Sequence, residues 1–258
     1  EYDVLQQNLE ALDSFVRAEI PSGRNINTAQ QKIFSEDFLQ QVKEVCEETG
    51  QNYEYAINSL GSLGGGNHFI EIDKNENDEL WLLIHSGSRN FGLKVANYHQ
   101  KIAETIQYKE KRTEIIAQLK KEYSGEELGQ KISEISIKKP DKGLEYLEGD
   151  NLFTYQRHIR IDQYYAHVNR RLISAKVLYF LGINSAFCEV RESVHNYIDF
   201  NLGIIRKGAI DASQGKDVVI PLNMKDGVIF GKGKGNPEWN YSAPHGSGRT
   251  MSRTKAKE

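Results

Sequence analysis

The chain has 258 residues, of which 38% are hydrophobic and 27% are charged, and its formal net charge is −3. This length can bury a large core, and the near-neutral charge argues against a protein that coats nucleic acid through a basic face. Two cysteines cannot form a disulfide framework, and no apolar run is long enough to span a membrane. We therefore expect a protein of the reducing cytoplasm, without a membrane partner.

Two helices are predicted within the first 50 residues. Apolar residues at helical spacing predict a helix over 2–20 and a second helix over 30–49, which ends at Gly50. Cys46 lies near the end of the second helix. We interpret it as a thiol of the helical core rather than as a nucleophile.

The stretch 62–89, SLGGGNHFIEIDKNENDELWLLIHSGSR, has the highest density of chemically active residues in the first half of the chain. Two short strands separated by an acidic turn carry His68 and His85 at their ends, beside glycines that allow close approach of backbone to a ligand. Strand alternation places Asn67 and Glu71 on one face and His68 on the other. Glu71 therefore suits a second ligand, such as the polar edge of a nucleotide, better than a metal shared with His68.

The remainder of the chain is helical first and then strand-rich. Helical patterns cover 92–122 and 151–181, and the highly charged segment 123–150 between them is weakly periodic, as in a peripheral insertion. The arginines of the second pattern could form a basic face for phosphates or an ordinary solvated face. Short apolar runs predict strands at 185–190, 204–205, 218–220 and 228–230. This order predicts an α+β fold in one compact catalytic domain rather than a regular βαβ alternation.

Four histidines lie in loops flanked by glycine or asparagine: His68, His85, His195 and His245. Imidazole is the commonest metal ligand, and ligands from scattered positions can assemble one transition-metal site. Each histidine alone is more simply read as an ordinary core or loop residue. Four in similar surroundings favour a shared site.

His245 differs from the other three because a Gly-Ser-Gly turn follows it, and then Arg249 and Arg253, which are four residues apart. If a helix begins in this turn, both arginines lie on one face, and backbone N–H groups could hold an anion at the helix N-terminus. A histidine beside such an anion is placed to attack phosphorus. Together with Arg89 and Lys207, these residues suggest phosphoryl transfer.

Five motifs occur in a fixed order: GGGNHFIE, HSGSR, HN, RKGA and PHGSGRTMSR. Over about Pro21 to Arg253 they resemble the RtcB family of GTP-dependent RNA ligases. The resemblance implies mixed β layers flanked by helices, and an enzyme of RNA repair or tRNA splicing. Such an enzyme joins an RNA 3′-phosphate or 2′,3′-cyclic phosphate to a 5′-hydroxyl, using GTP and two Mn²⁺ ions through a covalent GMP–histidine.

By motif, the resemblance implies that His245 is the guanylylated histidine and that His68, His85 and His195 bind Mn²⁺. It implies cationic groups around the phosphates and the RNA ends at Arg89, Lys207, Arg249 and Arg253. The residues that it places at the nucleotide are Asn67, His68, Glu71, His195, Asn196, Pro221, Met224, His245, Gly246, Ser247 and Gly248.

The chain also departs from the family pattern. The family has an upstream Asp-x-x-Cys segment that completes and bridges the two-metal site, and none precedes Pro21. The sequence Pro221-Leu222-Asn223-Met224 stands where many members have a Pro-Gly-Ser-Met turn. We therefore expect residues 1–258 to be a ligase catalytic region that lacks N- and C-terminal parts, with 123–150 as a charged insertion. The alternatives are a metal-dependent phosphoesterase that uses the same histidines, and a catalytically impaired paralogue that binds RNA ends.

Overall fold

The computed structural model describes residues 2–31, 35–223 and 225–248. Within them, helices combine with four two-stranded sheets, so the predicted α+β class is confirmed. The chain divides into two compact units. The strand unit comprises Glu1–Val16, Phe69–Ile84 and Ser174–Glu258, and the helical unit comprises Arg17–His68 and His85–Ile173. The expected bounds of a single catalytic domain and of an insertion over 123–150 stay predictions.

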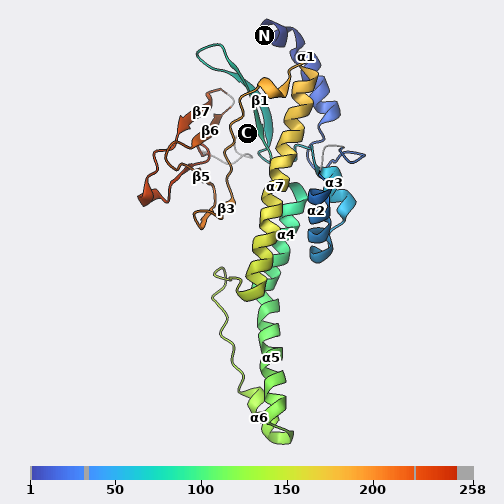
Figure 1. Cartoon of the computed structure of the whole chain (residues 1–258), viewed down its shortest axis with the longest axis vertical. Helices are drawn as coiled ribbons and strands as arrows, with labels where there is room; N and C mark the ends of the chain where they lie inside the picture. The colour runs from blue at the N-terminus through green and yellow to red at the C-terminus, as the bar shows by residue number, and fades with distance from the viewer. Residues whose placement is uncertain (1, 32–34, 224, 249–258) are drawn as a thin grey trace, which may run out of the picture. The chain divides into compact units, whose positions relative to one another are not determined.

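The core of the helical unit lies among α2 (Glu36–Thr49), α3 (Tyr53–Ser59), α4 (Arg89–Lys101) and α7 (Gly149–Phe180). Aromatic packing contributes to it, because the rings of Phe91 and Tyr165 stack with their centroids 4.7 Å apart. In Figure 1, α4 runs beside the long helix α7. α7 confirms the helix predicted over 151–181.

The second predicted helix begins later than its apolar pattern suggests. α2 starts at Glu36 because Ser35 caps it, with its Oγ accepting the N–H of Phe38 at 3.2 Å. It ends as predicted at Gly50, whose φ of 67° is left-handed. Cys46 is buried in the core, and burial raises the pKa of its thiol to about 11. The interpretation of Cys46 as a core thiol is therefore confirmed.

The helix predicted over 92–122 is present and begins three residues earlier, at Arg89. It contains a π-helical turn, η1 (Ile102–Ile106), and continues as α5 (Gln107–Glu122). A short helix, α6 (Gly125–Ser133), then packs against α5 (Figure 1). Its nine residues include two glycines, which explains why the sequence pattern did not predict a helix there.

The strand unit contains α1 (Tyr2–Glu19) up to Val16, which confirms the first predicted helix. Its longer strands form two hairpins. β1 (Phe69–Lys74) pairs with β2 (Leu80–His85), and β6 (Asp217–Asn223) pairs antiparallel with β7 (Gly227–Lys232). The hairpins meet through the rings of Trp81 and Phe230, whose centroids lie 4.6 Å apart. The guanidinium of Arg191 lies over both rings.

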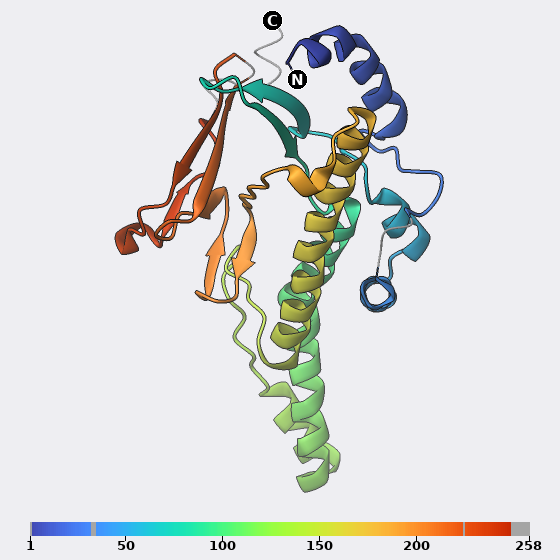
Figure 2. The same ribbon diagram turned by 45° about the horizontal axis from the view of Figure 1, so that its top comes forward.

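Four three-residue strands complete the strand unit (Figure 2). β3 (Tyr197–Asp199) pairs with β4 (Ile204–Arg206), and β5 (Ala209–Asp211) pairs with β8 (Ser242–Pro244), both antiparallel. The predicted strands at 204–205, 218–220 and 228–230 are thus confirmed. The strand predicted at 185–190 is wrong.

The segment 185–190 begins with a 3₁₀ turn, η2 (Ser185–Phe187), which Asn184 caps by accepting the N–H of Ala186. A second 3₁₀ turn is η3 (Pro237–Trp239). None of the helices in the described part of the chain combines the length and apolar composition needed to cross a lipid bilayer.

Candidate functional site

In the helical unit, the structure brings His68 and His85 together. His68 directly precedes β1 and His85 ends β2, and their ring centroids lie 5.6 Å apart. His68 Nδ1 lies 2.7 Å from the carbonyl oxygen of Leu63. Because a carbonyl only accepts, Nδ1 carries the proton and Nε2 keeps its lone pair. Burial lowers the pKa of His68, against the bond to Leu63, and so favours the neutral imidazole that binds metals.

Arg89 lies against the same histidine. Its Nε donates to Ser62 Oγ at 3.0 Å, and one terminal nitrogen donates to the carbonyl of Gly23 at 2.9 Å. Burial lowers the pKa of the guanidinium. Gly64 has a φ of 93°, and a Cβ there would collide with the Arg89 guanidinium and lie 2.6 Å from His68 Nδ1. Glycine at 64 is therefore what allows the cation and the imidazole to share this loop.

The amide of Asn67 also reaches this pair, since its Nδ2 lies 3.5 Å from His85 Nε2. Asn169 on α7 is a buried residue that the sequence analysis did not identify. It bonds to the loop before β1 and to the loop after β2. The available signal was its position four residues after Tyr165, on the buried stripe of the helix. An asparagine inside a helix is disfavoured unless its side chain has partners of its own.

In the strand unit, strand register gathers the other predicted residues. β5–β8 pairing sets Ala209 opposite Pro244, so Gly208 and His245, the residues next to them, lie side by side. His245 Nδ1 donates to the Gly208 carbonyl at 2.7 Å. Gly208 has a left-handed φ of 64°. A Cβ there would lie 3.5 Å from the His245 ring, an ordinary contact, so backbone conformation rather than space favours glycine.

β3–β4 pairing sets Tyr197 opposite Arg206 and so places Asn196 and Lys207 at the same end of that hairpin. Asn196 Oδ1 accepts the N–H of Gly208 at 2.6 Å. The ring centroids of His195 and His245 lie 4.6 Å apart. The backbone N–H and carbonyl of Gly208 therefore link the HN, RKGA and PHGSGR motifs, and the structure brings these predicted residues together.

The turn after His245 contacts the predicted nucleotide segment. Ser247 N–H donates to the Pro221 carbonyl at 3.2 Å, and Ser247 Oγ donates to the Leu222 carbonyl at 2.9 Å. Pro221 lies within β6, where the pairing with β7 shifts register. Gly248 has a left-handed φ of 74°. The predictions for Met224, Arg249 and Arg253, including a helix from the turn, fall outside the described residues.

Glu71 lies in β1 and is half-buried. Burial raises the pKa of its carboxyl, and the charge of Asp73 raises it further. Both effects disfavour the carboxylate, so a hydrogen-bond donor or a positive charge from a ligand would stabilise it. Its contact with a nucleotide stays a prediction.

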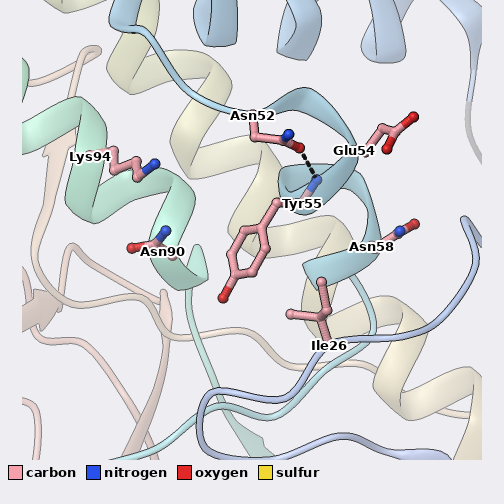
Figure 3. Close-up of a pocket in the computed structure, with 7 residues that line it drawn as sticks. All are labelled: Ile26, Asn52, Glu54, Tyr55, Asn58, Asn90 and Lys94. Atoms are coloured by element: carbon pink, nitrogen blue, oxygen red, sulfur yellow. Dashed lines mark hydrogen bonds between the residues drawn. The ribbon is translucent and has the colours of Figure 1, made fainter.

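A cleft of about 470 Å³ lies in the helical unit beside the HSGSR motif. Figure 3 shows Asn90 and Lys94 of α4 on one side and Tyr55 of α3 on the other, with Ile26 from the preceding loop. The remaining lining residues are Asn52, Glu54 and Asn58. Asn90 is the residue after Arg89 in the chain, and the lining of the cleft includes amide, ammonium and phenol groups.

No group of three or more His, Cys, Asp or Glu side chains able to hold a metal ion is assembled among residues 2–31, 35–223 and 225–248. His68 nevertheless fits the pattern of a metal ligand, because its Nδ1–H is bound by a backbone carbonyl and its Nε2 keeps a lone pair. His85 adds a second imidazole in the helical unit. These residues supply donors for part of a transition-metal coordination shell.

Comparison with known proteins connects these motifs to one family. A family model described as tRNA-splicing ligase RtcB matches residues 3–258. The RNA-splicing ligase RtcB of Escherichia coli strain K12 is 30% identical over 224 residues, covering 80% of this chain and 48% of the relative. The tRNA-splicing ligase RtcB of Aeropyrum pernix is 26% identical over 245 residues, covering 77% of this chain and 46% of the relative.

The chain therefore spans about half the length of the curated relatives that it matches. No solved structure matches it significantly.

Proposed function

Because the chain belongs to the RtcB family, we propose that it forms the catalytic region of a GTP- and Mn²⁺-dependent RNA ligase of RNA repair or tRNA splicing. The ligase joins RNA ends that carry a 3′-phosphate or a 2′,3′-cyclic phosphate to ends that carry a 5′-hydroxyl. The presence of two cysteines, both free among the described residues, supports a cytoplasmic location.

The observation that carries this proposal is the tautomer of His245. Its Nδ1–H donates to the Gly208 carbonyl, so Nε2 keeps the lone pair that a nucleophile needs. The backbone conformation that presents this carbonyl is left-handed at Gly208. The backbone N–H of the same residue, Gly208, donates to Asn196 Oδ1, which supports a fixed relation among the nucleophile, Asn196 and Lys207.

In the proposed reaction, His245 Nε2 attacks the α-phosphorus of GTP. An N–P bond forms, the α–β P–O bond breaks, and pyrophosphate leaves with the electron pair. An oxygen of the RNA 3′-phosphate then attacks the same phosphorus and displaces the histidine. Finally the 5′-hydroxyl attacks the activated 3′-phosphate, loses its proton to solvent, and releases GMP. A 2′,3′-cyclic phosphate is first opened by water.

Mn²⁺, when bound, neutralises charge on the triphosphate and polarises its phosphorus. His68, His85 and His195 would hold it as neutral imidazoles. Lys207 and Arg89 would balance phosphate charge, and so would Arg249 and Arg253 in the PHGSGRTMSR motif. The remaining predicted nucleotide contacts would come from Asn67, Glu71, Asn196, Pro221, Met224, Gly246, Ser247 and Gly248.

The experiment is covalent labelling with GTP that carries ³²P at the α-phosphate, in the presence of MnCl₂. We expect an acid-labile, hydroxylamine-sensitive adduct on the chain that His245→Ala abolishes. His167→Ala, a histidine on α7 outside the predicted site, is the matched control and should label like the parent. Lys207→Ala tests the other nitrogen nucleophile near Gly208 and should slow labelling without abolishing it.

Label that persists in His245→Ala and disappears in Lys207→Ala would move the nucleophile to Lys207 and overturn the proposal. Absence of label, together with Mn²⁺-dependent release of phosphate from an RNA 3′-phosphate, would favour the phosphoesterase. Absence of both activities, with retained binding to 3′-phosphorylated RNA, would favour the RNA-end-binding protein.

A further inference from the structure

Asn169 is a fully buried amide that bonds to both loops carrying the predicted site residues of the helical unit. Its exposed fraction is 0%. Its Oδ1 accepts the backbone N–H of Gly61 at 2.8 Å and of Ser62 at 3.2 Å. Its Nδ2 donates to the carbonyl of Ser62 at 3.2 Å and to that of Gly87 at 3.0 Å. One side chain therefore ties the loop before β1 to the loop after β2.

A chain of hydrogen bonds continues from this amide to His68. The two N–H groups of Asn169 Nδ2 are shared with a third acceptor, Ser86 Oγ at 3.0 Å, and Ser86 Oγ donates to the Leu63 carbonyl at 2.8 Å. The same carbonyl accepts His68 Nδ1 at 2.7 Å, which its two lone pairs allow. The amide thereby orients the acceptor that fixes the His68 tautomer. Ser86 also directly follows His85, the second histidine of the pair.

Arg89 is held through the same residue. Its Nε donates to Ser62 Oγ, and both the N–H and the carbonyl of Ser62 bond to Asn169. Ser62 is itself 0% exposed. Burial of an amide costs free energy unless its donors and acceptors are all satisfied. Here the carbonyl oxygen and the amide nitrogen of Asn169 both have partners, and all of those partners lie in the two loops.

We propose that Asn169 is the positioning residue of this histidine pair. It holds the Leu63 carbonyl and Ser86 in place, so that His68 keeps its Nδ1–H tautomer and presents Nε2 beside His85 to a metal ion. The metal part of this inference rests on the proposed function. The tautomer part concerns the metal-free chain alone.

Two measurements on the whole chain test it. NMR of ¹⁵N-histidine-labelled, metal-free protein reports which His68 nitrogen carries the proton, and calorimetric titration with MnCl₂ reports affinity. Asn169→Ala and the milder Ser86→Ala should each convert His68 to mixed tautomers and weaken Mn²⁺ binding roughly 10- to 100-fold, the usual effect of losing a partner of a metal ligand. Ser86→Thr keeps the hydroxyl and should restore both readouts to within about twofold of the parent.

Gln107→Ala is the matched control. Gln107 is a buried amide of the same unit that donates to the Tyr146 carbonyl at 2.6 Å, away from both loops. It should lower the free energy of unfolding while leaving the His68 tautomer and Mn²⁺ affinity unchanged. If this control weakened Mn²⁺ binding as much as Asn169→Ala does, the effect of Asn169 would be explained by lost stability of the fold, and the proposal would be overturned.

An unchanged His68 tautomer in folded Asn169→Ala and Ser86→Ala would overturn it as well. If Asn169→Ala does not fold, Ser86→Ala and Ser86→Thr decide the question between them. Failure of the proposed function has a different signature: no GMP adduct on His245, with the tautomer still shifting in the Ser86→Ala chain.

Discussion

The absence of a side chain at Gly64 leaves the space that the Arg89 guanidinium and the His68 imidazole occupy. Its φ of 93° is a conformation that L-residues rarely adopt, and its open side is filled by the Arg89 guanidinium and the His68 ring. Arg89 can move away from a new methyl group only by giving up its bonds to Ser62 and Gly23.

Gly64→Ala is therefore expected to lower the free energy of unfolding by about 3 kcal/mol, from backbone strain plus lost hydrogen bonds. Gly66→Ala is the matched control, because Gly66 has a similar φ of 79° but nothing within 4 Å of an added Cβ. It should cost only the strain, about 1 kcal/mol. Urea unfolding measures both. Equal losses would show that the space next to Arg89 plays no part.

At the scale of the elements, Arg206 joins the short strands that gather the His245 region. It is almost fully buried, and it donates to Tyr197 Oη at 2.9 Å, to Asp199 at 2.8 Å and to Ser242 Oγ at 3.0 Å. The pKa of Asp199 is lowered: burial opposes ionisation, but the bonds from Arg206 and from backbone N–H groups outweigh it. One guanidinium thus joins β3, β4 and β8, beside Lys207.

Arg206→Met should cost about 3 kcal/mol of unfolding free energy, because it removes the cation from the partly buried Asp199 carboxylate. Lys232→Met is the control, since it breaks an exposed ion pair to Asp217 in the neighbouring hairpin. Water screens that surface pair, so its loss is expected to cost far less than the loss of Arg206. Urea unfolding of both variants is the measurement, and similar losses would contradict the role given to Arg206. Loss of GMP labelling in folded Arg206→Met would further connect these strands to His245.

At the scale of the whole molecule, acid stability depends on a buried histidine pair that connects α2, α4 and α7. His158 lies between Glu48, at 2.9 Å from its Nε2, and His99, at 2.9 Å from its Nδ1. The carboxylate accepts from His158 Nε2–H, so His158 Nδ1 accepts from His99 Nε2–H. Within the described residues, His99 Nδ1 is buried without a hydrogen-bond partner. Burial, and then the neighbouring His158, lower the pKa of His99 to about 4.

His99 takes up a proton near pH 6.5 in the unfolded chain but only near pH 4 in the folded chain. The folded state is therefore most stable, relative to the unfolded state, above pH 6.5, where His99 is neutral in both. That stabilisation is lost as the pH falls through this window, by on the order of 3 kcal/mol. His99→Gln keeps a donor for His158 but does not titrate, so its unfolding free energy should fall less between pH 6.5 and 4. His167→Gln should follow the parent. Urea unfolding across this range is the measurement, and parallel curves for His99→Gln and the parent would contradict the prediction.

Much of the helical architecture could be predicted from the sequence because it is local. The stripe that ends at Gly50 and the long pattern that becomes α7 repeat over many turns. The start of α2 was missed because Ser35, rather than the apolar pattern, sets it. The strands β3, β5 and β8 have three residues each, too few for alternation to show.

The candidate site likewise has residues that the sequence identified and residues that it did not. Motifs located His68, His85, His195 and His245, and the structure shows two close pairs among them, His68 with His85 and His195 with His245. Asn169 was missed because its partners lie more than 80 residues away in sequence. A helix pattern shows which positions are buried, but it does not show which distant loop a buried amide meets.

Both key imidazoles, His68 and His245, donate Nδ1–H to main-chain carbonyls, those of Leu63 and Gly208. Every amino acid carries a main-chain carbonyl, so a substitution at position 63 or 208 leaves the hydrogen-bond acceptor in the chain. The Nδ1–H tautomer of each histidine therefore depends on the backbone conformation that presents the carbonyl, rather than on which side chain the partner residue carries. The side chain at position 63 can therefore change during evolution, within the limits of packing, without loss of the hydrogen bond that sets the His68 tautomer.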